Sequence, residues 1–209
     1  MSAQTINPDL FINNSPEANE SLYKYFAPRM YGICLRFAGN RMEADDILHE
    51  GFIRIFMKIK DFRNEGSLEG WIRRTIINTA INYYRRNARY SKMSELDSLE
   101  IPGESYNMVY DKISRDELLE IIQELPVGYR TVFNLNVIEG YTHKEIGELL
   151  NISDNTSKSQ LNRARLLLQR KIRSRLNEKV KVPFEGMTVL KRETDKQLSD
   201  VSEIFRQAV

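Results

Sequence analysis

Cysteine and histidine are scarce in this sequence, and their scarcity excludes two kinds of stabilising site. The 209 residues include one cysteine, Cys34, and two histidines. A single cysteine cannot form a disulfide within the chain, and no cluster of cysteine and histidine has the spacing of a zinc site, so we expect no metal. Cys34 lies in an apolar helical stretch. We therefore expect a small core residue rather than a redox sensor, in a protein of a reducing compartment.

Long apolar runs and strand patterns are missing as well. No stretch approaches the roughly 18 apolar residues that a membrane helix needs. Residues 1–20 lack the basic start and apolar run of a signal peptide. We therefore expect a soluble, cytoplasmic protein with no membrane insertion. A large net charge is also absent: the formal value is +2, so a nucleic-acid partner can be argued only from where the charges lie.

Helical periodicity dominates instead, and it divides the chain into two parts. The pattern predicts helices over residues 18–38, 42–60, 68–89, 117–125, 127–139, 142–150, 154–176 and, in the tail, 195–208. We expect Pro28 to kink or interrupt the first of them. Residues 91–116 break the pattern with Ser, Pro and Gly and carry a net charge of −3, which is typical of an interdomain linker.

The predicted fold is therefore all-α, with two small helical domains joined by a flexible linker. The predicted divisions are an N-terminal arm at 1–17, a first domain at 18–90, the linker at 91–116, a second domain at 117–178 and a C-terminal extension at 179–209.

The second domain contains the pattern of a helix-turn-helix. Thr142 and Glu145 have capping-box spacing, Asn151 tolerates the left-handed backbone of a tight turn, and Ser153 can cap the next helix. Gly147 would allow another helix to approach closely. Residues 155–177 contain seven bases and no acid, a local surplus suited to phosphate contacts. The alternative is a solvated basic face on an ordinary helical hairpin. For His143, a surface or cap-region position is favoured over metal binding.

Three segments resemble bacterial RNA polymerase sigma factors. Residues 43–56 (EADDILHEGFIRIF) resemble the helix that grips the polymerase clamp, residues 62–86 the promoter-melting segment, and residues 125–165 the domain that reads the −35 element. The absence of further domains points to the extracytoplasmic-function (ECF) group, the smallest class. Asn151 replaces the glycine common in the turn. Ser157 stands where the family usually has an apolar residue, which predicts looser packing.

The resemblance implies roles for three sets of residues. Expected contacts with the −35 element involve Asn155, Lys158, Ser159, Asn162, Arg163 and Arg165. Expected contacts with the melted −10 strand involve Arg63, Asn64, Glu65, Gly66 and Ser67 as a base pocket, Asn78, Asn82 and Tyr83 on unpaired bases, and Arg73, Arg74, Arg85 and Arg86 on phosphates. Expected contacts with polymerase involve Asp46, His49, Glu50 and Arg54. Core packing is the favoured interpretation of Trp71.

The resemblance also implies partners and a mode of action. The protein would bind core RNA polymerase, through the clamp of the β′ subunit and the flap of the β subunit, and start transcription of a specific regulon. An anti-sigma factor or another regulator would be a further partner. The protein would be nucleoid-associated when active. No covalent chemistry, catalytic residue or cofactor is expected.

Three other functions compete with this one. A pure interaction protein, such as a polymerase-binding anti-sigma mimic, would lack the basic recognition helix. A stand-alone helix-turn-helix regulator would have no use for the basic, aromatic-rich segment at 62–90. A recombinase or another DNA enzyme would need a carboxylate cluster with metal or an activated Ser or Tyr nucleophile. The acids at 43–50 lie on a helix whose neighbours look structural, and nothing supplies a base.

Overall fold

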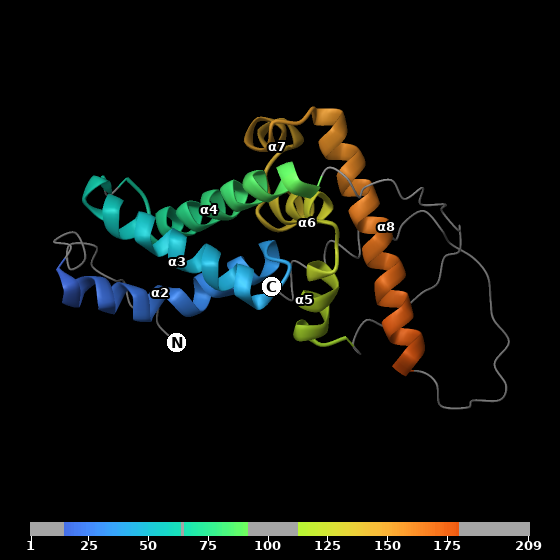
Figure 1. Cartoon of the computed structure of the whole chain (residues 1–209), viewed down its shortest axis with the longest axis horizontal. Coiled ribbons are helices and arrows are strands. Elements are labelled where there is room, and N and C mark those ends of the chain that lie inside the picture. Colours follow the sequence, from blue (N-terminus) through green and yellow to red (C-terminus); the bar gives the residue numbers. More distant parts are fainter. Residues whose placement is uncertain (1–14, 64, 92–112, 180–209) are drawn as a thin grey trace, which may run out of the picture. The chain divides into compact units, whose positions relative to one another are not determined.

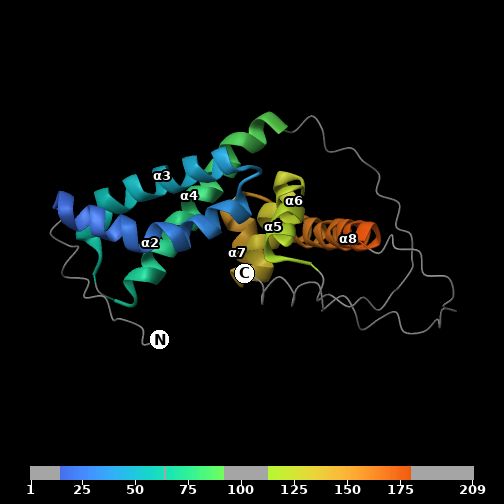
Figure 2. The same ribbon diagram turned by 90° about the horizontal axis from the view of Figure 1, so that it is seen from below.

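The computed structural model describes residues 15–63, 65–91 and 113–179, which fall into two compact units that divide between Arg86 and Asn87 (Figures 1 and 2). Within these ranges every regular element is a helix and no strand occurs, which confirms the all-α prediction. Most of the predicted N-terminal arm, most of the predicted linker and the predicted tail helix at 195–208 lie outside the described residues. No described helix combines the length and apolar character that crossing a membrane requires.

The first unit is built from three long helices that lie side by side in both views. They are α2 (Pro16–Phe37), α3 (Arg41–Lys58) and α4 (Leu68–Ser91), and a short 3-10 turn, η1 (Ile59–Asp61), follows α3. Ser15 and Asn40 cap α2 and α3, since their side-chain oxygens accept hydrogen bonds from the N–H groups of Ala18 and Glu43. The core includes Leu22, Phe26, Met30, Ile33, Cys34, Ile47, Phe52, Ile55, Ile72, Ile76 and Ala80.

Cys34 is part of this core, as predicted. It is fully buried, and burial in apolar surroundings raises the pKa of its thiol to about 12. The thiolate that redox chemistry needs is therefore scarce at neutral pH.

Pro28 was predicted to kink or interrupt the first helix, and the structure shows no interruption there. A single helix runs from Pro16 to Phe37 with Pro28 inside it. Proline cannot donate to the carbonyl of the residue four positions earlier, which is Lys24. Both Pro28 and Lys24 are exposed, so the carbonyl that loses its donor lies on the face that water reaches.

Residues 113–179, the described part of the second unit after α4, form four α-helices and one π turn. The helices are α5 (Arg115–Gln123), α6 (Val127–Phe133), α7 (His143–Leu150) and α8 (Asp154–Lys179), with the π turn η3 (Asn134–Ile138) extending α6. The single helix predicted over 127–139 is thus α-helical only in its first half. In Figure 1, α7 lies near the N-terminal end of α8, and α5 lies beside the rest of α8.

The turn between α7 and α8 forms as the sequence predicted. Asn151 has φ 56° and ψ 49°, a left-handed conformation, and the N–H of Ile152 donates to the carbonyl of Gly147 at 3.0 Å. A Cβ on Gly147 would lie 2.8 Å from the carbonyl oxygen of Ile152. The closest approach at Gly147 is therefore made by the backbone of the turn, and the first residue of the next helix, Asp154, follows with its amide nitrogen 3.7 Å from the same Cβ position.

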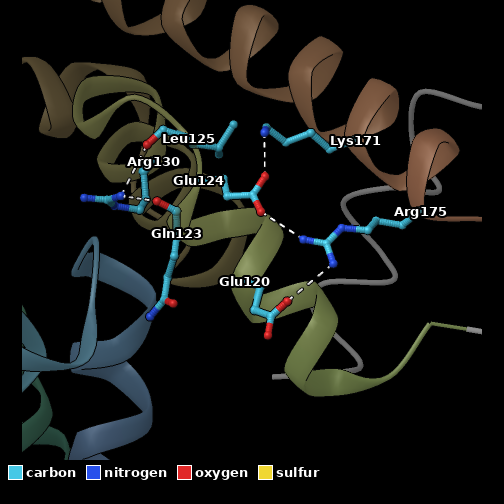
Figure 3. Close-up of polar contacts among 7 residues, drawn as sticks. All are labelled: Glu120, Gln123, Glu124, Leu125, Arg130, Lys171 and Arg175. Carbon is cyan, nitrogen blue, oxygen red and sulfur yellow. Dashed lines mark hydrogen bonds and ion pairs between the residues drawn. The ribbon is translucent and has the colours of Figure 1, made fainter. Parts of the chain in front are cut away.

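Arg130 joins α5 to α6 from inside the second unit. Its guanidinium is buried, and its Nη1 donates to the carbonyls of Gln123 at 2.6 Å and Leu125 at 3.2 Å (Figure 3). The last carbonyls of a helix have no partner within the helix, and a positive charge there is favourable. Arg130 therefore caps the end of α5 and fixes the start of the next helix against it.

Gly147→Ala should destabilise the second unit by about 1–3 kcal/mol, because the new Cβ would push the turn backbone out of place. Urea unfolding of the full chain measures this loss. Gly128→Ala is the matched control, since its Cβ would meet Gln160 at no less than 3.5 Å, an ordinary contact. A Gly147→Ala variant as stable as the Gly128→Ala variant would contradict this account of the turn.

Candidate nucleic-acid interface

The predicted −35 residues lie on the exposed face of α8. Asn155, Lys158, Ser159, Asn162 and Arg163 are all exposed, and their spacing places them on one side of the helix. The opposite side is buried through Leu161, Ala164, Leu168 and Ile172. Arg165 is only half-buried and lies off this row. The structure thus presents a polar helix face of a size and character suited to a DNA groove.

Three of these side chains are already held by neighbours in the protein. The ammonium of Lys158 pairs with the carboxylate of Asp154 at 2.6 Å, and the hydroxyl of Ser159 donates to the carbonyl of Thr156 at 2.9 Å. The guanidinium of Arg163 donates from Nη1 to the hydroxyl of Tyr129 at 3.2 Å. Because the Lys158 pair is exposed, it costs little to exchange for a DNA phosphate.

Ser157, where the sequence predicts looser packing, is a fully buried residue of α8. Its hydroxyl lies 2.9 Å from Nδ1 of His143, the first residue of α7. A polar contact thus replaces the apolar one that the family usually has here. His143 is half-buried at the helix start, close to the expected cap region, and no group of three potential metal ligands occurs among the described residues.

Two of the seven bases predicted to form the basic surplus at 155–177 form ion pairs with α5. Lys171 pairs with Glu124 at 2.5 Å, and Arg175 pairs with Glu124 at 3.0 Å and with Glu120 at 3.6 Å (Figure 3). These two bases hold the helices of the unit together. The charge surplus predicted from the sequence is therefore smaller at this end of α8 than the count of bases suggests.

In the first unit, the loop before α4 holds the residues predicted to form a base pocket. Arg63, Glu65, Gly66 and Ser67 are exposed, and Asn64 lies outside the described residues. Gly66 has φ +120°, which favours glycine, and the Oγ of Ser67 accepts a hydrogen bond from the N–H of Gly70 at 3.0 Å. Ser67 therefore has a second role as a cap at the start of α4.

The residues predicted to contact the melted strand are spread along α4. Arg74, Asn78 and Arg85 are exposed and follow one helical row together with half-buried Asn82. Arg86 is exposed next to this row, while Arg73 and Tyr83 are half-buried on other sides of the helix. The centre of the Trp71 ring lies 5.7 Å from the centre of the Phe62 ring, and Trp71 is half-buried. This contact agrees with the interpretation of Trp71 as a packing residue.

The predicted polymerase residues lie on α3, and one of them contacts α4. Asp46 and His49 are exposed, whereas Glu50 is half-buried and accepts hydrogen bonds from Arg54 at 2.7 Å and Arg86 at 2.5 Å. Burial raises the pKa of the Glu50 carboxyl, but the two guanidinium groups outweigh burial and lower it overall. Glu50 is therefore ionised. It connects Arg54, a predicted polymerase contact, to Arg86, a predicted phosphate contact.

The sequence analysis missed three apolar side chains on the same face of α3. Met42, Ile53 and Met57 are 76%, 58% and 77% exposed. They flank Asp46 and His49, since residues 42, 46, 49, 53 and 57 fall on one side of a helix. A signal for these three residues was available in the sequence, because they lie outside the apolar stripe formed by the buried residues of α3.

Comparisons with known proteins match both units. A family model described as Sigma-70 region 2 matches residues 22–90, and one described as Sigma-70, region 4 matches residues 115–168. The chain is 30% identical over 172 residues to the ECF RNA polymerase sigma factor SigW of Bacillus subtilis, which covers 75% of this chain and 90% of that relative. It is also 30% identical over 155 residues to the ECF RNA polymerase sigma factor SigE of Mycolicibacterium smegmatis.

The SigE alignment covers 72% of this chain but only 60% of that relative's length. Among solved structures, the sigma factor RpoE in complex with the anti-sigma factor NepR from Bartonella quintana matches 74% of this chain and 96% of that chain. That match has a TM-score of 0.45 and 17% identity.

Glu124→Gln should lower the stability of the second unit at pH 7 by about 0.5–1 kcal/mol, a small effect because the carboxylate is 42% exposed. Hydrogen bonding and charge from Lys171, then from Arg175, lower the pKa of Glu124 below its ordinary 4.5. A carboxyl whose pKa is lowered by folding stabilises the folded unit at pH values above its ordinary pKa. This stabilisation is lost as the pH falls through the folded-state pKa.

The difference between wild type and Glu124→Gln should therefore shrink below about pH 4, as urea unfolding at a series of pH values would measure. Glu148→Gln, which removes an exposed carboxylate from α7, controls for the change in net charge. A difference that stays constant from pH 7 to pH 3 would contradict the assigned pair.

Proposed function

The chain belongs to the extracytoplasmic-function group of RNA polymerase sigma factors, and we propose from this premise how its residues divide the work of that family. A sigma factor of this group binds core RNA polymerase, recognises the −35 and −10 promoter elements and starts transcription. This assignment rests on two family signatures, which occur in the same order along the chain as in the family. The polar face of α8 is a further observation in its support. We further propose residues 18–90 as the melting and clamp-binding domain and residues 117–178 as the −35-reading domain.

The −35 element would be read by the exposed row on α8. A helix that is buried along one side and polar along the other can enter the major groove with its N-terminal half. Lys158 and Arg163 suit guanine edges or phosphates, and Asn162 suits adenine. Lys171 and Arg175 have a different role, because their charges are engaged by the acids of α5.

The −10 element would be held as a melted strand along α4 and the loop before it. Asn78 and Asn82 can bond to unpaired bases, and Arg74 and Arg85 beside them can contact phosphates from the same row. The exposed loop residues Arg63 to Ser67 would enclose a base turned out of the stack. Arg86 would contact DNA only after leaving Glu50, so we assign it a smaller share of phosphate binding than Arg85.

Core polymerase would dock on the outer face of α3. Asp46 and His49 lie between the exposed side chains of Met42, Ile53 and Met57, a mixed polar and apolar surface of the kind that protein interfaces bury. The proposed partners are the β′ clamp on this face, the β flap for the second domain, promoter DNA, and an anti-sigma factor or another regulator.

Proteins of this family regulate transcription and are not themselves catalysts, and we propose the same for this chain, with no catalytic residue or cofactor. We also propose that it works in the cytoplasm and associates with the nucleoid when active. A stand-alone helix-turn-helix regulator is the competing function. The region 2 match over residues 22–90 argues against that function, because an operator-binding repressor needs no such domain.

Adding the purified protein to core RNA polymerase should produce run-off transcripts from a subset of genomic promoter fragments. Lys158→Ala should weaken promoter binding by about 1–3 kcal/mol if its side chain contacts a base edge. Lys24→Ala is the matched control, because Lys24 on α2 forms the same kind of ion pair, with Glu20 at 2.6 Å. Lys24→Ala should leave transcription unchanged. Duplex binding with no polymerase association and no transcript would refute the proposed function.

A further inference from the structure

The contact between Tyr129 and Arg163 connects the interior of the second unit to the proposed DNA-reading face. Tyr129 belongs to α6 and Arg163 to α8, 34 positions later in the chain. The tyrosine side chain is only 7% exposed, whereas Arg163 is exposed. The tyrosine hydroxyl accepts a hydrogen bond from Nη1 of Arg163 at 3.2 Å. A buried ring thus carries the atom that holds an exposed guanidinium.

Tyr129 is itself held firmly. Its ring packs in the core between α6 and α8, and the next residue, Arg130, ties α6 to the end of α5 through two backbone carbonyls. A tyrosine has few side-chain torsions, and burial on a packed helix fixes them. The position of its hydroxyl is therefore set by the fold of the unit rather than by the motion of a surface side chain.

An arginine that reads DNA benefits from such a fixed acceptor. A free arginine side chain samples many rotamers, and ordering it on binding costs free energy. One bond from Nη1 to Tyr129 restricts the guanidinium before DNA arrives, and a guanidinium has five N–H donors, of which this bond uses one. Preorganisation of this kind strengthens the contacts that depend on geometry more than those that depend on charge alone.

We propose that Tyr129 is a positioning residue that orients Arg163 for recognition of the −35 element. The inference rests on the proposed function, since it takes Arg163 to contact promoter DNA. It goes beyond that function by assigning sequence discrimination to a residue whose ring lies in the core. The sequence pattern alone presents Tyr129 as an ordinary apolar member of its helix.

The test compares Tyr129→Phe, Arg163→Ala and the double variant, each as full-length protein with core polymerase. The probe is a library of promoter duplexes randomised over the upstream element, and the readout is enrichment at each base pair. Tyr129→Phe should reduce discrimination by about threefold to tenfold at the positions that Arg163→Ala also affects. The double variant should lose no more discrimination than Arg163→Ala alone, because both changes remove one contact.

Two controls separate positioning from a structural effect. Tyr141→Phe makes the same chemical change on a half-buried tyrosine of the same unit and should leave enrichment unchanged. Urea unfolding should give Tyr129→Phe nearly the midpoint of wild type, because only an oxygen is removed. The salt dependence of binding should also stay as in wild type, since no cation is lost.

Each other outcome overturns a defined statement. If Arg163→Ala binds and discriminates like wild type, the proposed role of Arg163 fails, and the positioning role fails with it. If Arg163→Ala loses discrimination but Tyr129→Phe does not, only the positioning role fails. The positioning role would also be overturned by additive losses in the double variant or by a loss that is equal for all sequences. Tighter binding by Tyr129→Phe would overturn it too, because it would show that Tyr129 withholds Arg163 from DNA.

Discussion

The second unit depends on one buried cation. Arg130 satisfies the carbonyls at the end of α5 and at the connection to α6, and it does so from inside the core, where unpaired polar groups are costly. Two consequences follow from the resulting placement of the helices. α5 brings Glu120 and Glu124 to the bases on α8, and α6 brings Tyr129 to Arg163. The capping of a helix end is thus linked to the presentation of the proposed DNA-reading face.

Charge on the basic helices is divided between structure and recognition. On α8, the bases near the C-terminal end pair with the acids of α5, whereas Lys158 and Arg163 point to the exposed row near its start. On α4, Arg86 is paired with Glu50, whereas Arg85 is exposed. A net charge of +2 for the chain therefore says little about DNA binding, because the position of each cation and its ion pairs within the units matter more than the total.

Periodicity and capping residues were sufficient to predict the helices of both units and the left-handed turn at Asn151. They were insufficient where tertiary contacts decide. Pro28 was expected to kink or interrupt its helix, but a single helix continues through it, with Pro28 on an exposed face. The hydroxyl of Ser157 can be buried because His143, 14 positions earlier, supplies a partner. Spacing placed Asn155 and Asn162 on one exposed face of α8, whereas Arg73 and Arg165 are half-buried and lie off the exposed rows of their helices. The Glu50–Arg86 and Tyr129–Arg163 contacts could not be predicted, because they join residues far apart in the chain.

The most direct test of this account is native-state amide hydrogen exchange on full-length Arg130→Met. Methionine fills a similar volume but donates no hydrogen bond, so the carbonyls of Gln123 and Leu125 would lose their partner. The account predicts that protection against exchange falls by about 2–3 kcal/mol in α5, α6 and α8 and stays as in wild type in α2 and α3. Unchanged protection throughout the second unit would contradict the claim that Arg130 holds it together.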